Sequence, residues 1–253
     1  MKLSYKEVGN GKPLIILHGL FGSSDNWISI ARKLGESRKV FILDQRNHGD
    51  SPHSNEFNYQ VMANDLKEFI EDHSIENFDL IGHSLGGKTA MLFATQNPSL
   101  VNKLIIVDIA PKLYSVHHDT IIEGLKAIDL TSLKSRNEAD ATLAEYVPLI
   151  GVRQFLLKNL KRTPLGFGWK INLEVIQNEI EEVGKGLPPA AHFDKPTLFI
   201  RGGMSNYILD DDMGIINTHF PKARLATVKS ASHWVHAEKP IDFLLETNSF
   251  LTS

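Results

Sequence analysis

Cysteine is missing from all 253 positions of the sequence. This absence excludes a disulfide scaffold, a thiol nucleophile, cysteine-ligated zinc and iron–sulfur clusters. A chain of this length needs no disulfide or metal cross-link to be stable, because folding removes about three quarters of its surface from water and so forms a sufficient hydrophobic core. At roughly 150 residues per domain, the chain has room for one α/β domain with an insert.

Long apolar runs and an excess of positive charge are missing as well. No stretch approaches the ~20 apolar residues of a membrane-spanning helix, and the first residues, MKLSYKEVGNGKP, lack the apolar segment of a signal peptide. Lysine and arginine number 27 against 30 aspartate and glutamate, which gives a net charge of −3 and no bulk support for nucleic-acid binding. We therefore expect a soluble cytoplasmic protein with no membrane or nucleic-acid partner, monomeric by default.

Short apolar segments alternate with helix-like stretches along the chain. Such alternation is typical of a mostly parallel sheet with helices on both faces. We expect strands at 14–17, 40–43, 78–81, 104–107, 197–200 and 224–228, and helices at 27–34, 59–73, 85–96 and from 240 onward. Ligands of such sheets bind outside the carboxyl ends of the strands. The polar residues at those ends are His18, Asp44, Ser84 and Asp108.

The strand pattern is interrupted after Pro111. Residues 112–191 have helical spacing at 119–128, 139–149, 152–160 and 173–183, with proline and glycine between the segments. A helical insert between two sheet strands has the character of a lid over an active site. The sequence thus predicts an α/β core formed by residues 1–111 and 192–253, and a helical cap formed by residues 112–191.

The most informative motif is Gly82-His83-Ser84-Leu85-Gly86. It matches G-x-S-x-G between a predicted strand and a predicted helix, which is the context of a nucleophile elbow. A serine on such a sharp turn leaves no room for side chains at the flanking positions, and both of these are glycine. Ser84 is therefore predicted as a nucleophile at a helix start, whose N–H groups and dipole favour a developing anion.

A serine hydroxyl needs a base, and the base needs a carboxylate that fixes its tautomer. The loop before the last helix offers His233 as the better candidate for the base, with His236 as its rival. Asp108, which ends a strand, is a candidate for the acid. We interpret Asp44 as an ion-pairing loop residue and residues 210–212 as helix-capping carboxylates.

Acyl transfer also requires donors for the oxyanion of the tetrahedral intermediate. The backbone N–H of Leu85, directly after the nucleophile, should be one donor. The other should come from the loop His18-Gly19-Leu20-Phe21-Gly22 after the first core strand, and we assign it to the N–H of Leu20.

Six stretches of the sequence together resemble the α/β-hydrolases. In detail they are similar to the YbfF-type bacterial esterases and related abhydrolase-domain proteins. The stretches are LHGLFGSSDNW (17–27), DQRNHGDSPHS (44–54), LIGHSLGGKTAM (80–91), VDIAPKLY (107–114), FIRGGMSNYI (199–208) and SHWVHAEKP (232–240). The resemblance implies Ser84 as nucleophile, Leu20 and Leu85 as oxyanion donors, and His233 as base. His236 does not fit the family register of His, four residues, Glu, one residue, Pro.

The third member of the catalytic triad departs from the commonest family pattern. Most α/β-hydrolases place the acid after the strand that follows the cap, as G-x-x-Asp, but here Ser205 occupies that position. A serine cannot carry the charge, so the acid must come from elsewhere. The resemblance implies Asp108, with Asp210 in reserve.

The resemblance implies a serine carboxylesterase or thioesterase that acts through an acyl-enzyme on a small-molecule acyl ester or thioester. No cofactor and no metal is expected. The alternatives are a hydrolase-fold ligand-binding protein with weak turnover, and a perhydrolase or carbon–carbon hydrolase with the same triad. A pocket between the sheet edge and the cap should be lined by aromatic residues, for which the candidates are Phe21, Tyr114, Phe167, Trp169, Tyr207 and Trp234.

Overall fold

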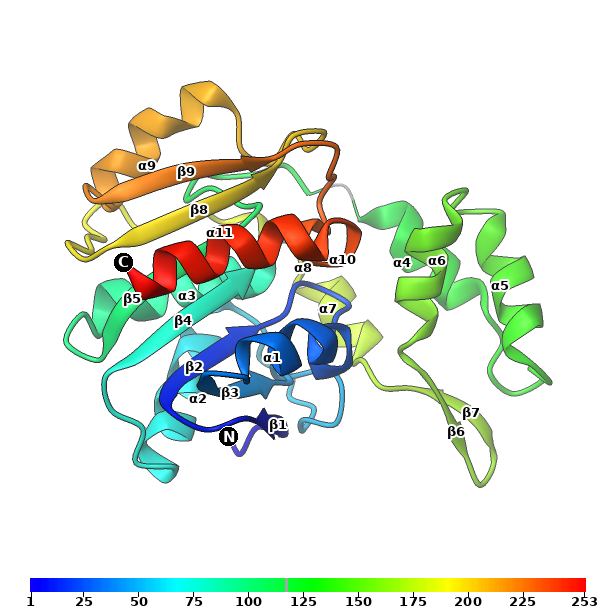
Figure 1. Ribbon diagram of the computed structural model, residues 1–253. Coiled ribbons are helices and arrows are strands. Elements are labelled where there is room, and N and C mark those ends of the chain that lie inside the picture. Colours follow the sequence, from blue (N-terminus) through cyan, green and yellow to red (C-terminus); the bar gives the residue numbers. More distant parts are fainter. Residues whose placement is uncertain (117) are drawn as a thin grey trace.

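A computed structural model of the protein describes residues 1–116 and 118–253. A seven-stranded sheet in the order β1-β3-β2-β4-β5-β8-β9 forms its centre (Figure 1). Neighbouring strands run parallel, except that β1 pairs antiparallel with β3. The predicted mostly parallel sheet is thus confirmed. The strands are β1 (Tyr5–Val8), β2 (Lys12–Leu17), β3 (Arg38–Leu43), β4 (Phe78–His83), β5 (Val101–Val107), β8 (Thr197–Gly202) and β9 (Ala223–Val228).

All six predicted strands lie within observed strands. The central residues of β2 and β5 are apolar and buried, as expected for strands covered on both faces. The sequence did not predict β1, because exposed and half-buried positions alternate along Tyr5–Val8. An antiparallel strand at a sheet edge can face water on one side, so it needs no continuous apolar run.

Helices cover both faces of the sheet (Figure 1). On one face α1 (Ile28–Leu34), α10 (Val235–Glu238) and α11 (Pro240–Thr252) share a hydrophobic core with the strands. On the other face the core includes side chains of α2 (Tyr59–Asp72), α3 (Leu85–Gln96) and α9 (Met213–His219). The loops at the carboxyl ends of the parallel strands are therefore the part of this core where a ligand site can form.

An insert lies between β5 and β8, and its larger part forms the lobe at the right of Figure 1. It has a hydrophobic core of its own, which continues onto Leu20, Phe21 and Leu85 beside the predicted nucleophile. The division of the chain at residues 112 and 191 stays a prediction, and we refer to this insert as the cap. Its elements are α4 (Asp119–Ala127), α5 (Arg136–Ala144), α6 (Ile150–Leu157), β6 (Leu160–Thr163), β7 (Gly166–Trp169), α7 (Leu173–Asn178) and α8 (Ile180–Gly184).

The prediction of helices alone in the cap was wrong in two places. The expected helix 152–160 ends at Leu157, and the chain continues into the antiparallel hairpin of β6 and β7. The expected helix 173–183 is divided into α7 and α8. The strands of the hairpin have only four residues each, which is too short for a recognisable alternation of apolar and polar residues.

The two chain segments that connect the cap to the core run side by side. The N–H of Tyr114 donates to the carbonyl of Gly184 at 2.8 Å, and the N–H of Leu187 donates to the carbonyl of Pro111 at 2.9 Å. A Cβ at position 184 would lie 2.4 Å from the carbonyl oxygen of Tyr114, so this contact depends on glycine. The two points at which the chain enters and leaves the cap therefore lie next to each other.

A buried lysine of the core lies at this junction of cap and core. Lys88 of α3 donates from Nζ to the carbonyl of Lys112 at 2.6 Å and to the carbonyl of Lys185, one on each connecting segment. The rings of Tyr59 and Tyr114 lie 5.9 and 5.0 Å from its ammonium group. Burial lowers the pKa of Lys88 to about 7, and the nearby charge of Lys112 acts in the same direction.

The low pKa of Lys88 should make the stability of the protein depend on pH. Unfolding returns the pKa from about 7 to 10.5, so the unfolded chain binds more protons between these values. Lys88 therefore does not destabilise the folded protein above the pKa of the unfolded state. The folded protein loses stability as the pH falls toward the pKa of the folded state, about 7. We expect a slope of up to about 1.4 kcal/mol per pH unit in this window, which Lys88→Met removes. Urea unfolding of both proteins at pH 7, 8 and 9 measures it, and equal slopes would contradict the assignment.

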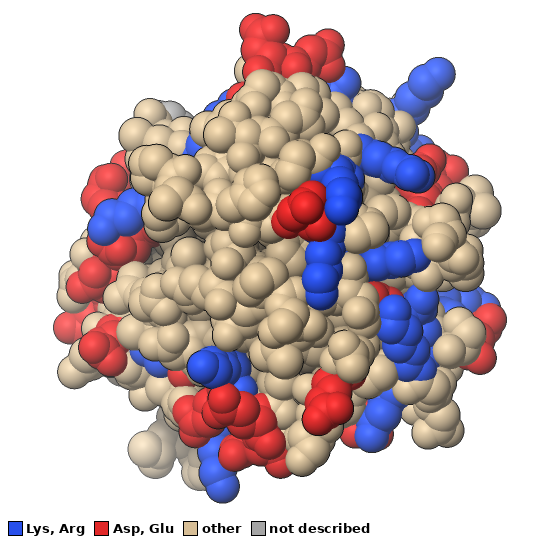
Figure 2. Space-filling view, turned by 90° about the vertical axis from the view of Figure 1, so that its left-hand side faces the viewer, with Lys and Arg blue, Asp and Glu red and all other residues tan. Residues whose placement is uncertain are grey.

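Charged side chains of both signs occur on the face opposite the cap, around a broad area that has none (Figure 2). This mixture fits the small net charge of −3. None of the helices in the described parts of the chain combines the length and apolarity that a bilayer crossing requires.

Candidate active site

Ser84 lies on a strained turn between β4 and α3. Its backbone has φ 52° and ψ −115°, a conformation that residues with side chains rarely adopt. A Cβ at position 82 would lie 2.3 Å from the carbonyl oxygen of Gly86, and one at position 86 would lie 2.5 Å from that of Leu17. Glycine is therefore required on both sides of the turn. The turn places Ser84 at the carboxyl edge of the sheet, where it lines a cavity.

Asp108 follows β5 and is fully buried. Its Oδ2 lies 2.8 Å from Nδ1 of His233, and its Oδ1 accepts the N–H of Gly202 at 3.0 Å. The hydroxyl of Ser205 donates to Oδ2. These contacts hold the carboxylate in place and turn it toward the imidazole. The bond to Asp108 puts a proton on Nδ1 of His233, so Nε2 is the nitrogen that can accept a proton.

Ser84 and His233 line the same cavity, without a direct hydrogen bond between them. Catalytic hydrogen bonds are often long in enzymes without substrate and tighten when substrate binds. The structure thus brings together the three residues predicted as the triad, with the pair of His233 and Asp108 already formed.

Ser205 has a contact that the sequence did not reveal. The position was recognised only as unable to carry charge, whereas its hydroxyl is a hydrogen-bond donor to Asp108. The reserve acid, Asp210, has its carboxylate in contact with another side chain and not with His233. Its carboxylate pairs with Arg201 at 2.7 Å, and its side chain is 87% exposed.

Two further histidines, His83 and His236, lie behind His233 and are buried. His236 is buried and stacks on Trp27, with 3.8 Å between ring centroids. Burial lowers its pKa to about 3. His83 is buried beneath the turn, and its Nε2 donates to the carbonyl of His233 at 2.9 Å. His83 therefore holds the backbone of His233, and His236 belongs to the packing behind it.

The two residues predicted as oxyanion donors, Leu20 and Leu85, line the same cavity as Ser84. Leu20 is the second residue of a turn closed by the N–H of Gly22 and the carbonyl of Gly19 at 2.9 Å. The third residue, Phe21, has φ 59°, as in type II turns. Leu20 and Leu85 both line the cavity with Ser84, and neither backbone N–H has a partner among the described residues. The two groups remain available for a ligand oxygen.

The loop after β3 is hydrogen-bonded to His18, the residue directly before this turn. Nε2 of His18 accepts the N–H of Gln45 at 3.0 Å, and burial lowers the pKa of His18 to about 4. The interpretation of Asp44 as an ion-pairing residue was wrong, because its carboxylate accepts the N–H groups of Ser24 and Asp50.

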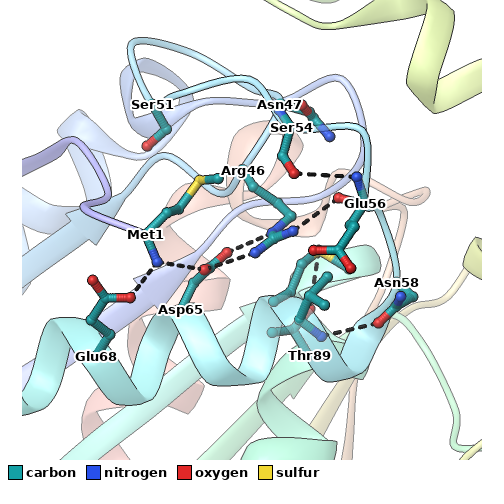
Figure 3. Close-up of polar contacts among 12 residues, drawn as sticks. Met1, Arg46, Asn47, Ser51, Ser54, Glu56, Asn58, Asp65, Glu68 and Thr89 are labelled. Atoms are coloured by element: carbon teal, nitrogen blue, oxygen red, sulfur yellow. Dashed lines mark hydrogen bonds and ion pairs between the residues drawn. The ribbon is translucent and has the colours of Figure 1, made fainter.

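Arg46 of the same loop pairs with α2. Its guanidinium donates to both carboxylate oxygens of Asp65 at 2.6 and 2.9 Å, and to the carbonyl of Glu56 (Figure 3). A bidentate pair of this kind fixes the direction of both side chains. Arg46 therefore anchors the loop to α2.

Two cavities meet at Ser84. One has a volume of about 410 Å³ and extends past Leu85 toward the junction of cap and core. The other has a volume of about 160 Å³ and lies beneath α6. Tyr207 and His233 line both. The larger is apolar toward the junction, where its lining residues include Tyr59, Ile109, Tyr114, Val116 and Val183.

Four of the six aromatic residues named as candidates line these cavities. Phe21 and Trp234 line the smaller cavity, Tyr114 the larger one, and Tyr207 both. Trp169 was a wrong choice, since it lies on β7 and borders a separate hollow between α4 and α7. Its place in a hairpin strand, not in a helix over the site, is the reason. Phe167 on the same strand packs in the core of the cap.

Tyr59 is a lining residue that sequence reasoning missed. It is the first residue of α2, and its hydroxyl donates to the carbonyl of Val183 at 2.7 Å, from core to cap. An aromatic residue on an amphipathic helix is equally typical of simple core packing, so no signal in the sequence marked it. Among residues 1–116 and 118–253, no three His, Asp or Glu side chains gather in a way that could hold a metal ion.

Known proteins share this fold and much of this sequence. A family described as having the alpha/beta hydrolase fold matches residues 12–133. The chain is 42% identical over 252 residues to the sn-1-specific diacylglycerol lipase ABHD11 of Danio rerio, over 96% of this chain and 79% of that protein. It is 36% identical over 232 residues to Esterase YbfF of Escherichia coli, over 91% and 89%. A solved structure titled as a marine microorganism esterase has a TM-score of 0.96 and 43% identity, over 98% and 99%.

Proposed function

Because the chain belongs to the α/β-hydrolase family and is a carboxylic ester hydrolase, we propose that Ser84, His233 and Asp108 carry out the reaction through an acyl-enzyme. The observation that carries this proposal is the hydrogen bond of 2.8 Å between Asp108 and His233, beside a serine on a strained elbow that lines the same cavity. A neutral imidazole in this tautomer is the base that a serine nucleophile requires.

The reaction proceeds in two halves. Nε2 of His233 takes the proton of the Ser84 hydroxyl as the oxygen attacks the carbonyl carbon of the ester. Asp108 stabilises the imidazolium, and the N–H groups of Leu20 and Leu85 stabilise the oxyanion. The bond to the leaving group breaks, and His233 gives its proton to that group. Water then attacks the acyl-enzyme by the same route and releases the acid.

The substrate class follows from the cavities around Ser84. The larger cavity is lined mostly by apolar and uncharged polar side chains, which favours an uncharged acyl chain. The name of the Danio rerio relative states a diacylglycerol substrate, which is of this kind. We propose acyl esters as substrates, with acyl thioesters as the second class, and a cytoplasmic monomer without nucleic-acid or membrane partners as the working form.

Labelling with a fluorophosphonate tests the nucleophile. We expect intact-mass measurement to show one adduct on the wild-type protein and none on Ser84→Ala, because only an activated serine reacts quickly. The melting temperature of the variant controls for folding. An adduct that persists in Ser84→Ala would show that a residue other than Ser84 is the nucleophile. Well-folded wild type without an adduct would favour a ligand-binding protein on this fold.

The two substrate classes can be separated in one experiment. Esters are tested with p-nitrophenyl acyl esters, and thioesters with acyl thioesters and a thiol-reactive dye. The protein has no cysteine, so every thiol detected comes from the substrate. Turnover of esters alone, thioesters alone or both assigns the leaving group.

A further inference from the structure

The peptide groups of Phe21, at the oxyanion turn, are held from two different parts of the molecule. The N–H of Phe21 donates to Nε2 of His48 at 3.2 Å, and His48 belongs to the core. The carbonyl of Phe21 accepts Nδ2 of Asn159 at 2.7 Å, and Asn159 belongs to the cap, between α6 and β6. The backbone that follows Leu20 is therefore fixed jointly by the core and the cap.

His48 is built to accept this bond. It is fully buried, and its Nδ1 lies 2.9 Å from the carbonyl of Arg46. A carbonyl can only accept, so the proton is on Nδ1, and Nε2 accepts the N–H of Phe21. Burial lowers the pKa of His48 to about 3, with a further contribution from His18. The imidazole therefore stays neutral over the pH range in which an esterase works. The hydrogen bond from the N–H of Phe21 to His48 is kept throughout this range.

Asn159 is equally well fixed on the side of the cap. Its side chain is buried, and Nδ2 also donates to the carbonyl of Leu156 at 3.1 Å. Its own N–H donates to the same carbonyl, and its own carbonyl accepts the N–H of Lys170 at 2.7 Å. Asn159 is thus a rigid part of the cap that reaches the core at a single group, the carbonyl of Phe21.

The conformation of the turn makes this contact important. Phe21 has φ 59°, which a residue with a side chain adopts only where its surroundings impose it. Both of its peptide groups are buried, so losing a partner leaves a polar group unpaired and favours rotation of the backbone. The peptide group directly before these two carries the N–H of Leu20, one of the two oxyanion donors.

We propose that Asn159 is a positioning residue of the oxyanion hole, through which the cap sets the direction of the Leu20 N–H. This inference rests on the proposed function, because it assumes that the N–H of Leu20 stabilises an oxyanion. It makes the cap part of the machinery that stabilises the transition state, in addition to a wall of the substrate pocket.

The test compares Asn159→Ala with Asn172→Ala. Asn172 also belongs to the cap, and its Nδ2 also donates to the core, to Oδ1 of Asn47 at 3.2 Å, but it does not touch the oxyanion turn. Loss of a whole oxyanion donor costs about 10²–10³ in kcat. A misdirected donor should cost part of this, so we expect kcat of Asn159→Ala to fall about 10- to 100-fold with KM nearly unchanged. Asn172→Ala should retain its kcat.

A tetrahedral inhibitor separates positioning from a purely structural role. A boronic acid that forms an adduct with the active-site serine should lose affinity in Asn159→Ala by a factor similar to the loss in kcat. A carboxylic acid product should bind as before. Asn159→Leu, which has nearly the same shape but lacks the donor and adds no charge, should behave like Asn159→Ala and serves as the main variant if alanine lowers the melting temperature.

Several outcomes would overturn the inference. A rise in KM with unchanged kcat would mean that Asn159 only holds the pocket. Equal losses in Asn159→Ala and Asn172→Ala would mean that any loosening of the cap has this effect. A wild-type protein that neither hydrolyses esters nor reacts with a fluorophosphonate would instead refute the proposed function, and this inference with it.

Discussion

His233→Ala is expected to lower kcat for ester hydrolysis about 10⁶-fold, the loss seen when a serine enzyme is deprived of its base. The reason is that the two histidines packed behind it, His83 and His236, cannot replace it. His83 lies beneath the turn and donates its Nε2 proton to the carbonyl of His233, and His236 is buried in contact with Trp27. Steady-state kinetics on a p-nitrophenyl ester measures the effect. Labelling of Ser84 by a fluorophosphonate should slow in parallel.

The control for His233→Ala is His236→Phe. The phenylalanine retains a ring against Trp27, where the histidine ring stacks at 3.8 Å, so the fold should be preserved. We expect activity within a few-fold of wild type. If His236→Phe were inactive and His233→Ala active, the base would have to be reassigned.

Asp108→Asn should lower kcat about 10⁴-fold with KM largely unchanged. The amide has the size of the carboxylate, and its oxygen can still accept the N–H of Gly202, which now lies 3.0 Å from Oδ1. Its NH₂ group would face Nδ1 of His233 and act as a donor. The imidazole would then carry its proton on Nε2 and could not accept that of Ser84.

Asp210→Asn is the matched control for the acid. This carboxylate is exposed and pairs with Arg201 at the surface, and surface ion pairs contribute little. We expect unchanged kcat and melting temperature. Near-normal turnover in Asp108→Asn together with a loss in Asp210→Asn would transfer the role of the acid.

The sequence was most informative where local chemistry and chain order coincide. The elbow around Ser84 is defined by two glycines between a strand and a helix, and each of these features is visible in a few consecutive residues. The buried strands were predicted for the same reason, since an apolar run of four to six consecutive residues indicates a buried strand without information from elsewhere in the chain. Asp108 could be placed because it directly follows such a run.

Contacts across the chain could not be predicted in this way. Ser205 lies 97 positions from Asp108, and Asn159 lies 138 positions from Phe21. An asparagine after a helix is usually a cap or a surface residue, so its type alone did not indicate a bond to the oxyanion turn. The prediction that Trp169 lines the active-site pocket was wrong for a related reason. The face of the cap that meets the core depends on how the hairpin and the helices pack. No periodicity in the sequence reports that arrangement.

Because β5 pairs directly with β8, we expect catalytic competence to be a late event in folding. Val107 pairs with Ile200 across the whole cap, and His233 reaches Asp108 over 125 positions. Contacts so distant in the chain form slowly, because the loop between them must be closed before any favourable energy is gained. Secondary structure around Ser84 can form early from local contacts, while β8 and the histidine loop should join last. During refolding, helical signal should therefore recover before esterase activity does, and the interval between them measures the docking of the second half of the sheet.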